Sequence, residues 1–194
     1  MEYDIRAFNH LIRHRRSVYP NQYDPGRQIP GEVIRQILEN AIWAPNHGHT
    51  EPWHFTVFSG EGLKKLASFQ SDLYKSESGD AFKEAKYLKL QQQPLLASHI
   101  ISIAMRRSPE KKIPEVEEIA AVSCAVQNIY LSTTVYGLGG YWTTGGITYM
   151  KKAKPFFGLE DQDKLLGFFY LGYIAAPAVA ALRRPLDEKV VWVS

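Results

Sequence analysis

The sequence predicts an α+β fold of three layers, with helices on both faces of a central mixed β-sheet. The chain has 194 residues, a length that favours a single domain, 1–194, with a sizeable core. Apolar residues make up 45% of the chain and charged residues 22%, the balance of a globular protein rather than a disordered one. Short β-branched and aromatic runs alternate with segments of helical periodicity, and this alternation is typical of a sheet covered by helices.

The first third of the chain predicts two helices, a strand and a third helix. Asp4 can cap a helix that carries four apolar residues on one face: Ile5, Phe8, Leu11 and Ile12. A second helix follows Pro30 and ends before Pro45, because proline suits the first helical turn and cannot continue a helix. Residues 53–58 are predicted to form a strand, and Ser59 to cap the third helix.

The middle of the chain predicts a buried strand between two helical regions. Residues 70–95 are polar and of mixed charge, which indicates an exposed helical excursion. Residues 99–105 form a short apolar run, a buried strand. A long helix over 115–136 opens after Pro114 with acidic residues in its first turn and is apolar on several faces. Such a helix requires burial on several sides, in a core or at a subunit interface.

The last third predicts two strands and a C-terminal arm. Strands are expected near 141–143 and at 165–174, with a brief helix near 150–157 between them. Residues 165–182 contain no charge, close to the lower limit for a membrane-spanning helix. Glycines and a proline interrupt that run, and its aromatic residues favour a strand over a helix. We therefore interpret it as a buried strand and expect no membrane partner. The end of 183–194 is rich in valine and carries a tryptophan, which predicts a packed arm.

Charge and cysteine content exclude further classes. There are 23 Lys and Arg side chains against 20 Asp and Glu, and a net charge of +3 is too weak a field to predict nucleic-acid binding. Cys124, the single cysteine, can form neither a disulfide within the chain nor a cysteine-based zinc site, and we interpret it as structural. The start MEYDIRAFNH lacks the apolar region of a secretion signal, so we expect a cytoplasmic protein.

Arg15, Arg16 and Ser17 form the first segment that could carry chemistry. Two guanidinium groups and a hydroxyl within three residues suit a phosphate, which needs charge and several donors together. A solvated basic helix end is the alternative, because cations favour the negative end of the helix dipole. An RNA-binding arm is a second alternative, but no stacking platform accompanies the basic residues.

The second segment is the loop 44–53, A-P-N-H-G-H-T-E-P-W. Two prolines bracket it between a helix and a strand, a position where binding groups gather. Its polar side chains could instead hold a metal ion, with the candidate ligands His47, His49, Glu51 and His54. The spacing matches no helix-borne metal signature, and polar packing within the loop is the third possibility.

Two further segments give weaker evidence of a binding site when each is taken on its own. Residues 137–146 are rich in glycine, which permits close approach to a flat ligand and leaves N–H donors at 144–146. The pattern is not a dinucleotide fingerprint, and a plain turn between helix and strand explains it equally well. Residues 182–188 hold two arginines and alone indicate a basic surface turn.

Together these segments, in this order, resemble the nitroreductase family of flavin enzymes, in its small single-domain branch. The resemblance spans nearly the whole chain. It rests on R-R-S at 15–17, A-P-N-H with P-W at 44–53, G-L-G-G-Y-W at 137–142, L-G-F-F-Y-L-G-Y at 166–173 and R-R-P-L-D-E at 183–188.

The resemblance implies a nitroreductase-like homodimer with two FMN molecules at the subunit interface. Arg15, Arg16 and Ser17 would hold the FMN phosphate and ribityl chain, and Arg183 would close on the phosphate. Pro45, Asn46 and His47 of the partner subunit would line the isoalloxazine ring, with His49 nearby. The segment of Trp142, Thr143, Thr144 and Gly145 would cover the other face, with N–H groups near flavin N5, under the excursion at 70–95.

Three positions depart from the family pattern. Tyr19 stands where many members have an arginine, which removes one contact to the ribityl chain or the phosphate. His49 stands where many have asparagine and Glu51 where many have glutamine, which changes the polar groups available to the pyrimidine edge. A carboxylate facing the ring would disfavour an anionic reduced flavin, so we expect Glu51 to turn away or to pair with a cation.

The implied activity is ping-pong hydride transfer from NADH or NADPH through flavin N5 to a small electron-poor acceptor, a nitroaromatic or a quinone. No side chain is singled out as a general acid or base. A flavin carrier or sensor without turnover is the first alternative, and a metal-dependent hydrolase built on the His47 loop the second. The physiological acceptor and the preference between NADH and NADPH do not follow from the sequence.

Overall fold

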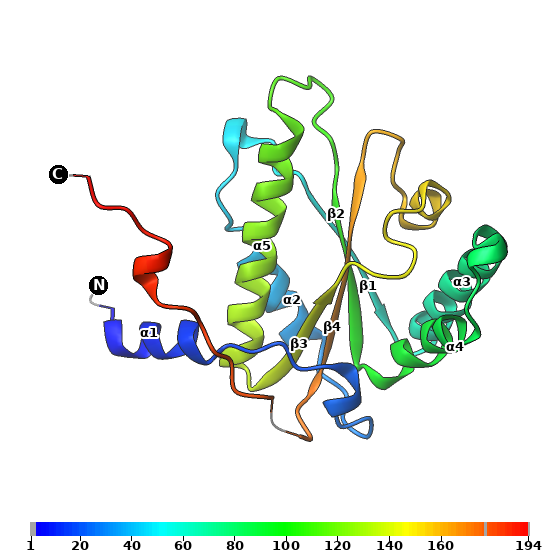
Figure 1. Ribbon diagram of the computed structural model, residues 1–194, viewed down its shortest axis with the longest axis horizontal. Coiled ribbons are helices and arrows are strands. Elements are labelled where there is room, and N and C mark those ends of the chain that lie inside the picture. Colours follow the sequence, from blue (N-terminus) through cyan, green and yellow to red (C-terminus); the bar gives the residue numbers. More distant parts are fainter. Residues whose placement is uncertain (1–2, 177, 194) are drawn as a thin grey trace.

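The computed structural model describes residues 3–176 and 178–193. Its centre is a four-stranded sheet with the strand order β1-β2-β4-β3. The strands are β1 (Trp53–Ser59), β2 (His99–Met105), β3 (Leu138–Thr143) and β4 (Lys164–Tyr173). Helices α2 (Gly31–Ala41) and α5 (Glu115–Val135) cover one face, and α3 (Glu61–Glu77) and α4 (Glu84–Gln92) cover the other (Figure 1). The predicted α+β fold of three layers is confirmed.

The expectation of a mixed sheet is corrected. All described neighbouring strands pair antiparallel. Between β1 and β2 the chain forms a hairpin of two helices, which returns it to the end of β1, so that Ser59 pairs with His99. A single helix, α5, connects β2 to β3 and makes these two strands run in the same direction, but β4 lies between them. β2 and β3 therefore run parallel to each other, but they are not hydrogen-bonded to each other.

Both faces of the sheet are buried, which is why its central strands are apolar throughout rather than alternating. The side chains toward α3 and α4 are Ile100, Ala104, Phe168 and Tyr170. Those toward α2 and α5 are Ile101, Ile103, Met105, Phe169 and Leu171. Two cores thus form, one on each side of the sheet.

Local signals set the helix ends, with one correction. The α1 helix (Ile5–His14) begins as predicted after Asp4, whose Oδ1 accepts hydrogen bonds from the backbone N–H groups of Arg6 (2.8 Å) and Ala7 (3.2 Å). The predicted Ser59 cap is wrong: Ser59 is the last residue of β1, and Gly60 precedes α3. Gly60 has φ 49° and ψ −121°, a conformation that glycine adopts without a Cβ penalty, so the turn geometry decides the helix start.

The remaining short elements are 3₁₀ helices: Pro20–Gln22, His47–His49, Gly79–Ala81, Gln93–Leu96, Lys151–Phe157 and Leu186–Glu188. The brief helix expected near 150–157 is one of them. The excursion at 70–95 comprises the end of α3, α4 and two of these turns.

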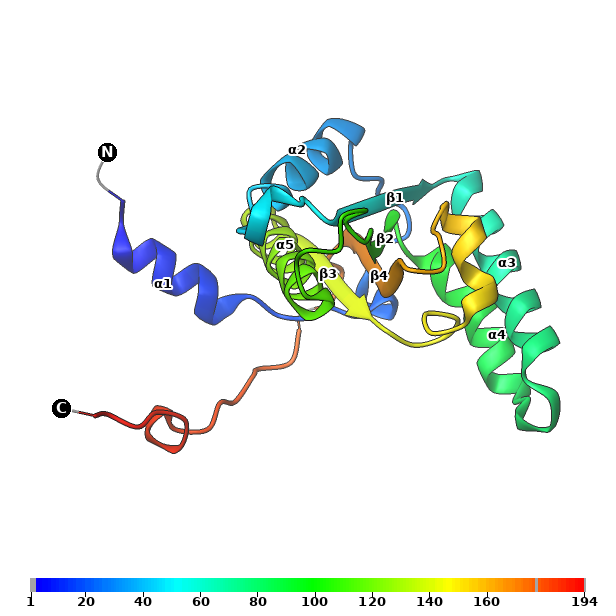
Figure 2. The same ribbon diagram turned by 90° about the horizontal axis from the view of Figure 1, so that it is seen from above.

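The α1 helix and the C-terminal segment extend away from the body, on the α5 side of the sheet, in both views (Figures 1 and 2). No residue of α1 is buried. Large apolar side chains are exposed on both segments: Ile5, Phe8, Ile12, Val179, Leu182, Val191, Trp192 and Val193. So many exposed large apolar side chains on two extended segments indicate that another surface covers them. Among the described residues, no helix combines the length and apolar composition needed to cross a bilayer.

Candidate functional site

The segment 15–19 crosses the free edge of the sheet. β3 is an edge strand, and the backbone N–H of Val18 donates to the carbonyl oxygen of Gly140 at 3.0 Å. This contact places Arg15 and Ser17, which follow α1, beside the second half of β3. Two of the sequence segments singled out for chemistry, 15–17 and 137–146, therefore meet at one edge.

Tyr130 on α5 joins these two segments. Its hydroxyl accepts a hydrogen bond from the backbone N–H of Trp142 at 2.8 Å and lies 3.3 Å from Ser17 Oγ. The Arg15 guanidinium lies over the Tyr130 ring, 4.7 Å from its centroid. Tyr130 was not among the residues predicted from the sequence. A hydroxyl-bearing ring in an otherwise apolar helix is nevertheless a usable signal, because buried tyrosines need a polar partner.

The other arginines do not point at this cluster. Arg16 Nη1 donates to the carbonyl oxygens of Arg13 (2.6 Å) and Arg15 (2.8 Å), so it satisfies groups at the C-terminal end of α1. Arg183 is exposed on the C-terminal segment, where its Nη1 donates to the Leu182 carbonyl at 2.9 Å. No described contact joins Arg183 to Arg15 or Ser17. Among the described residues of a single chain, Arg183 therefore does not join Arg15 and Ser17 in one site.

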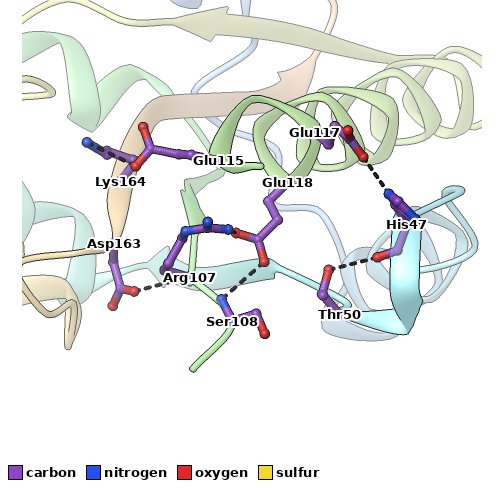
Figure 3. A network of polar contacts seen from close by, with 9 residues as sticks. All are labelled: His47, Thr50, Arg107, Ser108, Glu115, Glu117, Glu118, Asp163 and Lys164. Atoms are coloured by element: carbon purple, nitrogen blue, oxygen red, sulfur yellow. Dashed lines mark hydrogen bonds and ion pairs between the residues drawn. The ribbon is translucent and has the colours of Figure 1, made fainter. Parts of the chain in front are cut away.

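The loop 44–53 lies at the opposite end of α5. His47 Nδ1 is 2.6 Å from Glu117 Oε2 in the first turn of α5, as Figure 3 shows. Asn46 Oδ1 accepts a hydrogen bond from the Glu51 backbone N–H at 3.1 Å. At 1.5 Å per residue, Glu117 and Tyr130 are about 20 Å apart along α5. The structure thus separates Pro45, Asn46 and His47 from Arg15 and Ser17.

The backbone of this loop is unusual. Gly48, His49 and Glu51 all have positive φ, at 64°, 52° and 43°. The left-handed conformation costs free energy at the two non-glycine positions, and the hydrogen bond that the Glu51 N–H donates to Asn46 Oδ1 helps to hold it at Glu51. Such strain is concentrated at binding sites.

Glu51 lines a hollow of about 460 Å³ whose wall carries two cations, Arg106 and Arg107, and two further carboxylates, Glu160 and Asp163. No ion pair of Glu51 is among the described contacts, so the expectation that it turns away from the flavin or pairs with a cation stays a prediction. Within residues 3–176 and 178–193, no group of three or more His, Cys, Asp or Glu side chains is placed to hold a metal ion. The geometry of the loop therefore gives the metal-ligand interpretation no support.

A buried ion pair fixes the surroundings of the loop. Glu118 is fully buried on α5 and pairs with the Arg107 guanidinium, while its second oxygen accepts the Ser108 N–H at 3.1 Å (Figure 3). Asp163 accepts the backbone N–H of Arg107 at 2.9 Å. This network attaches the connection after β2 to α5, so its role is structural.

Most glycines of β3 and β4 serve packing rather than ligand approach. Gly139 and Gly172 face each other across the β3–β4 pair beneath the Tyr23 ring; a Cβ on Gly172 would lie 2.5 Å from Tyr23 Cγ. The Tyr23 hydroxyl lies 2.8 Å from the Val18 carbonyl oxygen and 3.1 Å from that of Tyr170, and burial raises the pKa of Tyr23. Tyr23 thereby holds the segment that carries Arg15 and Ser17.

The turn after β3 retains two of the three predicted donors. The Gly145 N–H donates to Thr143 Oγ1 at 3.3 Å. The N–H groups of Thr144 and Gly146 have no acceptor in the described part of the chain. These two donors lie directly after Trp142, whose own N–H is held by Tyr130.

Comparison with known proteins identifies the family. The profile of the nitroreductase family matches residues 12–173. "Putative NAD(P)H nitroreductase YdjA" of Escherichia coli (strain K12) is 30% identical, over 80% of this chain and 83% of that protein. Human "Iodotyrosine deiodinase 1" is 26% identical, over 97% of this chain and 69% of that protein.

Solved structures share the fold. The crystal structure of a nitroreductase-like family protein from Bacillus cereus superposes with a TM-score of 0.80 at 27% identity, covering 100% of this chain and 98% of that one. The FMN-dependent nitroreductase NfnB from Mycobacterium smegmatis, solved with NADPH, gives 0.76 at 21% identity, covering 97% and 99%. The chain belongs to the nitroreductase family.

Proposed function

We propose that the protein is a cytoplasmic, homodimeric, FMN-dependent NAD(P)H oxidoreductase that acts on a nitroaromatic or quinone acceptor. The observation that carries this proposal is the cluster of Arg15, Ser17 and Tyr130 at the edge of β3, next to the turn at 144–146. The names of the E. coli and M. smegmatis relatives point the same way.

The residues of the cluster fit FMN. Arg15 and Ser17 offer a guanidinium and a hydroxyl to the phosphate, and no carboxylate is among the described contacts of this cluster. The N–H groups of Thr144 and Gly146 would be aimed at the polar edge of the ring. The bound cofactor would supply ping-pong hydride chemistry at N5 between NAD(P)H and the acceptor.

The second half of the site comes from a partner subunit. The loop 44–53 and the Tyr130 cluster lie near opposite ends of α5, and an antiparallel pairing of two α5 helices would bring the loop of each chain to the cluster of the other. The exposed strip of α5 suits this packing, because it carries no charge after Glu117. The strip consists of the exposed residues Val116, Ala120, Cys124, Gln127 and Val135 and the half-buried Leu131.

The pairing predicts where the two-fold axis lies. If Tyr130 of one chain lies level with Glu117 of the partner subunit, the axis passes α5 next to Cys124. Cys124 is exposed in the single chain rather than part of its core. The uncovered α1 helix and the C-terminal segment, with Arg183, would then wrap the partner.

An anaerobic absorbance spectrum tests the function. We expect the purified protein to carry about one FMN per chain, to lose the flavin absorbance on addition of NADPH, and to regain it when a nitroaromatic or a quinone is added. Protein that stays colourless after incubation with FMN would exclude the proposal. Bound FMN that NADH and NADPH both fail to reduce would establish the carrier instead.

A charge at the axis tests the dimer. Cys124→Asp places two carboxylates against each other, so we expect light scattering to show monomers and the flavin content to fall. Ser68→Asp, on the exposed face of α3, adds the same charge away from the interface and should leave both unchanged. A dimeric Cys124→Asp protein with full flavin content would contradict the α5 pairing.

A further inference from the structure

A cavity of about 260 Å³ lies between α4 and the end of β3. Its wall includes Lys86, Lys89 and Leu90 of α4, Tyr141 and Thr143 of β3, and the turn at 145–146. We refer to it as the α4 pocket. It shares Thr143 and Gly145 with the segment proposed to face the flavin, so a molecule in it would lie next to the reacting ring.

The α4 pocket has a positive wall with no negative side chain. Lys86 and Lys89 are its charged lining residues, and neither forms an ion pair within the described part of the chain. Lys86 Nζ lies over the Tyr74 ring, 4.5 Å from its centroid. Two ammonium groups without a carboxylate partner on one helix face favour an anion between them.

The buried polar residues that line the pocket are neutral. Gln70 is buried, and its Nε2 donates to the Leu90 carbonyl oxygen at 2.7 Å. Tyr170 is also buried, and burial raises its pKa, so its hydroxyl stays protonated at neutral pH. These two lining residues therefore offer dipoles and an aromatic ring rather than a competing carboxylate.

The size suits one substituted aromatic ring. A cavity of about 150 Å³ accepts benzene, and the α4 pocket is larger by the space of a few substituent atoms. Tyr141 and Phe168 supply apolar contact for such a ring.

We infer that the α4 pocket binds the anionic oxygen group, carboxylate or phosphate, of the molecule that reacts at the flavin, with Lys86 and Lys89 as the residues that determine this specificity. The inference rests on the proposed function. It favours aromatic acids among electron acceptors; the 2′-phosphate of NADPH carries the same chemistry and is the other possible source of the anion.

Binding measured without turnover tests the inference. In calorimetric titrations of the flavin-loaded protein, we expect 4-nitrobenzoate to bind on the order of tenfold more weakly to Lys86→Gln/Lys89→Gln than to the unmodified chain, with a preference that salt reduces. Neutral 4-nitrobenzamide should bind both equally. Lys83→Gln, at the start of α4 but outside the pocket lining, is the matched control and should bind 4-nitrobenzoate normally.

The nicotinamide arm separates the two sources of the anion. NADP⁺ and NAD⁺ are used in this arm because they bind without reducing the flavin. A loss confined to 4-nitrobenzoate assigns the pocket to the acceptor, and a loss confined to NADP⁺ relative to NAD⁺ assigns it to the 2′-phosphate. Equal affinities of the double variant and the unmodified chain for both anions would overturn the inference, as would a parallel loss for the neutral amide. A protein that binds FMN and is reduced by NADPH while showing either result would refute the pocket assignment alone and leave the proposed function standing.

Discussion

Replacing Tyr130 by phenylalanine tests the connection on which the site depends. The change removes one oxygen and keeps the ring, so the edge-on packing against Phe169, with centroids 4.6 Å apart, and the position under Arg15 are preserved. The lost group accepts the Trp142 N–H at 2.8 Å and lies 3.3 Å from Ser17 Oγ. The perturbation therefore isolates the polar link between α5, β3 and the segment 15–17.

The expected cost follows from the donor left without a partner. The Trp142 N–H is half-buried, and an unsatisfied buried donor costs about 1–3 kcal/mol. For a chain of this length, that loss lowers the melting temperature by about 2–12 °C.

Chemical denaturation of the flavin-free protein measures this cost, and the flavin-free state avoids the added stability of bound ligand. Tyr136→Phe is the control, because Tyr136 is exposed and its hydroxyl has no hydrogen bond within the described residues. FMN affinity of Tyr130→Phe should also fall, since Ser17 loses its anchor. Equal stability of the two variants would refute the reasoning.

Three further predictions concern stability. Glu118→Gln leaves the Arg107 charge uncompensated and should lower the free energy of unfolding by about 3–5 kcal/mol in urea titrations, whereas Glu115→Gln breaks an exposed pair and should cost less than about 1 kcal/mol; similar losses would contradict the burial argument. Gly172→Ala drives a Cβ into the Tyr23 ring and should cost about 2–3 kcal/mol, but Gly31→Ala, with open space around it, should cost nothing measurable. Burial lowers the pKa of His99 in the folded protein, so the unfolded chain binds more protons and stability should fall as the pH drops below about 6.5; an unchanged pH slope in His99→Gln would exclude His99 as the cause.

The elements that local chemistry determines were predictable from the sequence. Asp4 caps α1, Pro30 precedes α2, and the strand predicted at 165–174 from an uncharged aromatic run corresponds to the buried strand β4 (Lys164–Tyr173). Each of these residues determines the structure only within a few positions of itself in the sequence. The layered fold followed from their alternation.

Features that depend on distant packing were not predictable. The antiparallel sheet results from a two-helix return between β1 and β2, whose length alone does not reveal the turn within it. Glu118 has the position of an ordinary acidic first-turn residue, and only the tertiary structure shows it fully buried against Arg107. Gly139 belongs to the glycine-rich segment predicted to approach a flat ligand, and the structure instead covers it with the Tyr23 ring, which is far away in sequence.

The candidate site also has a part that was predictable from the sequence and a part that was not. The short segments 15–17 and 142–146 were found from residue type, and the structure brings them together through Tyr130. Arg183 and the loop 44–53 remain predictions for the dimer, because one chain holds them away from the cluster.

Subunit complementation tests most directly whether each flavin site is shared between two chains. One chain carries Arg15→Glu/Ser17→Asp and the other Asn46→Asp/His47→Asp, with different affinity tags so that only heterodimers are purified. Each variant alone should form a folded dimer that holds no FMN. The heterodimer joins two damaged halves at one interface site and two intact halves at the other, so we expect about one FMN per two chains, reducible by NADPH. A flavin-free heterodimer would mean that both halves must lie on the same chain.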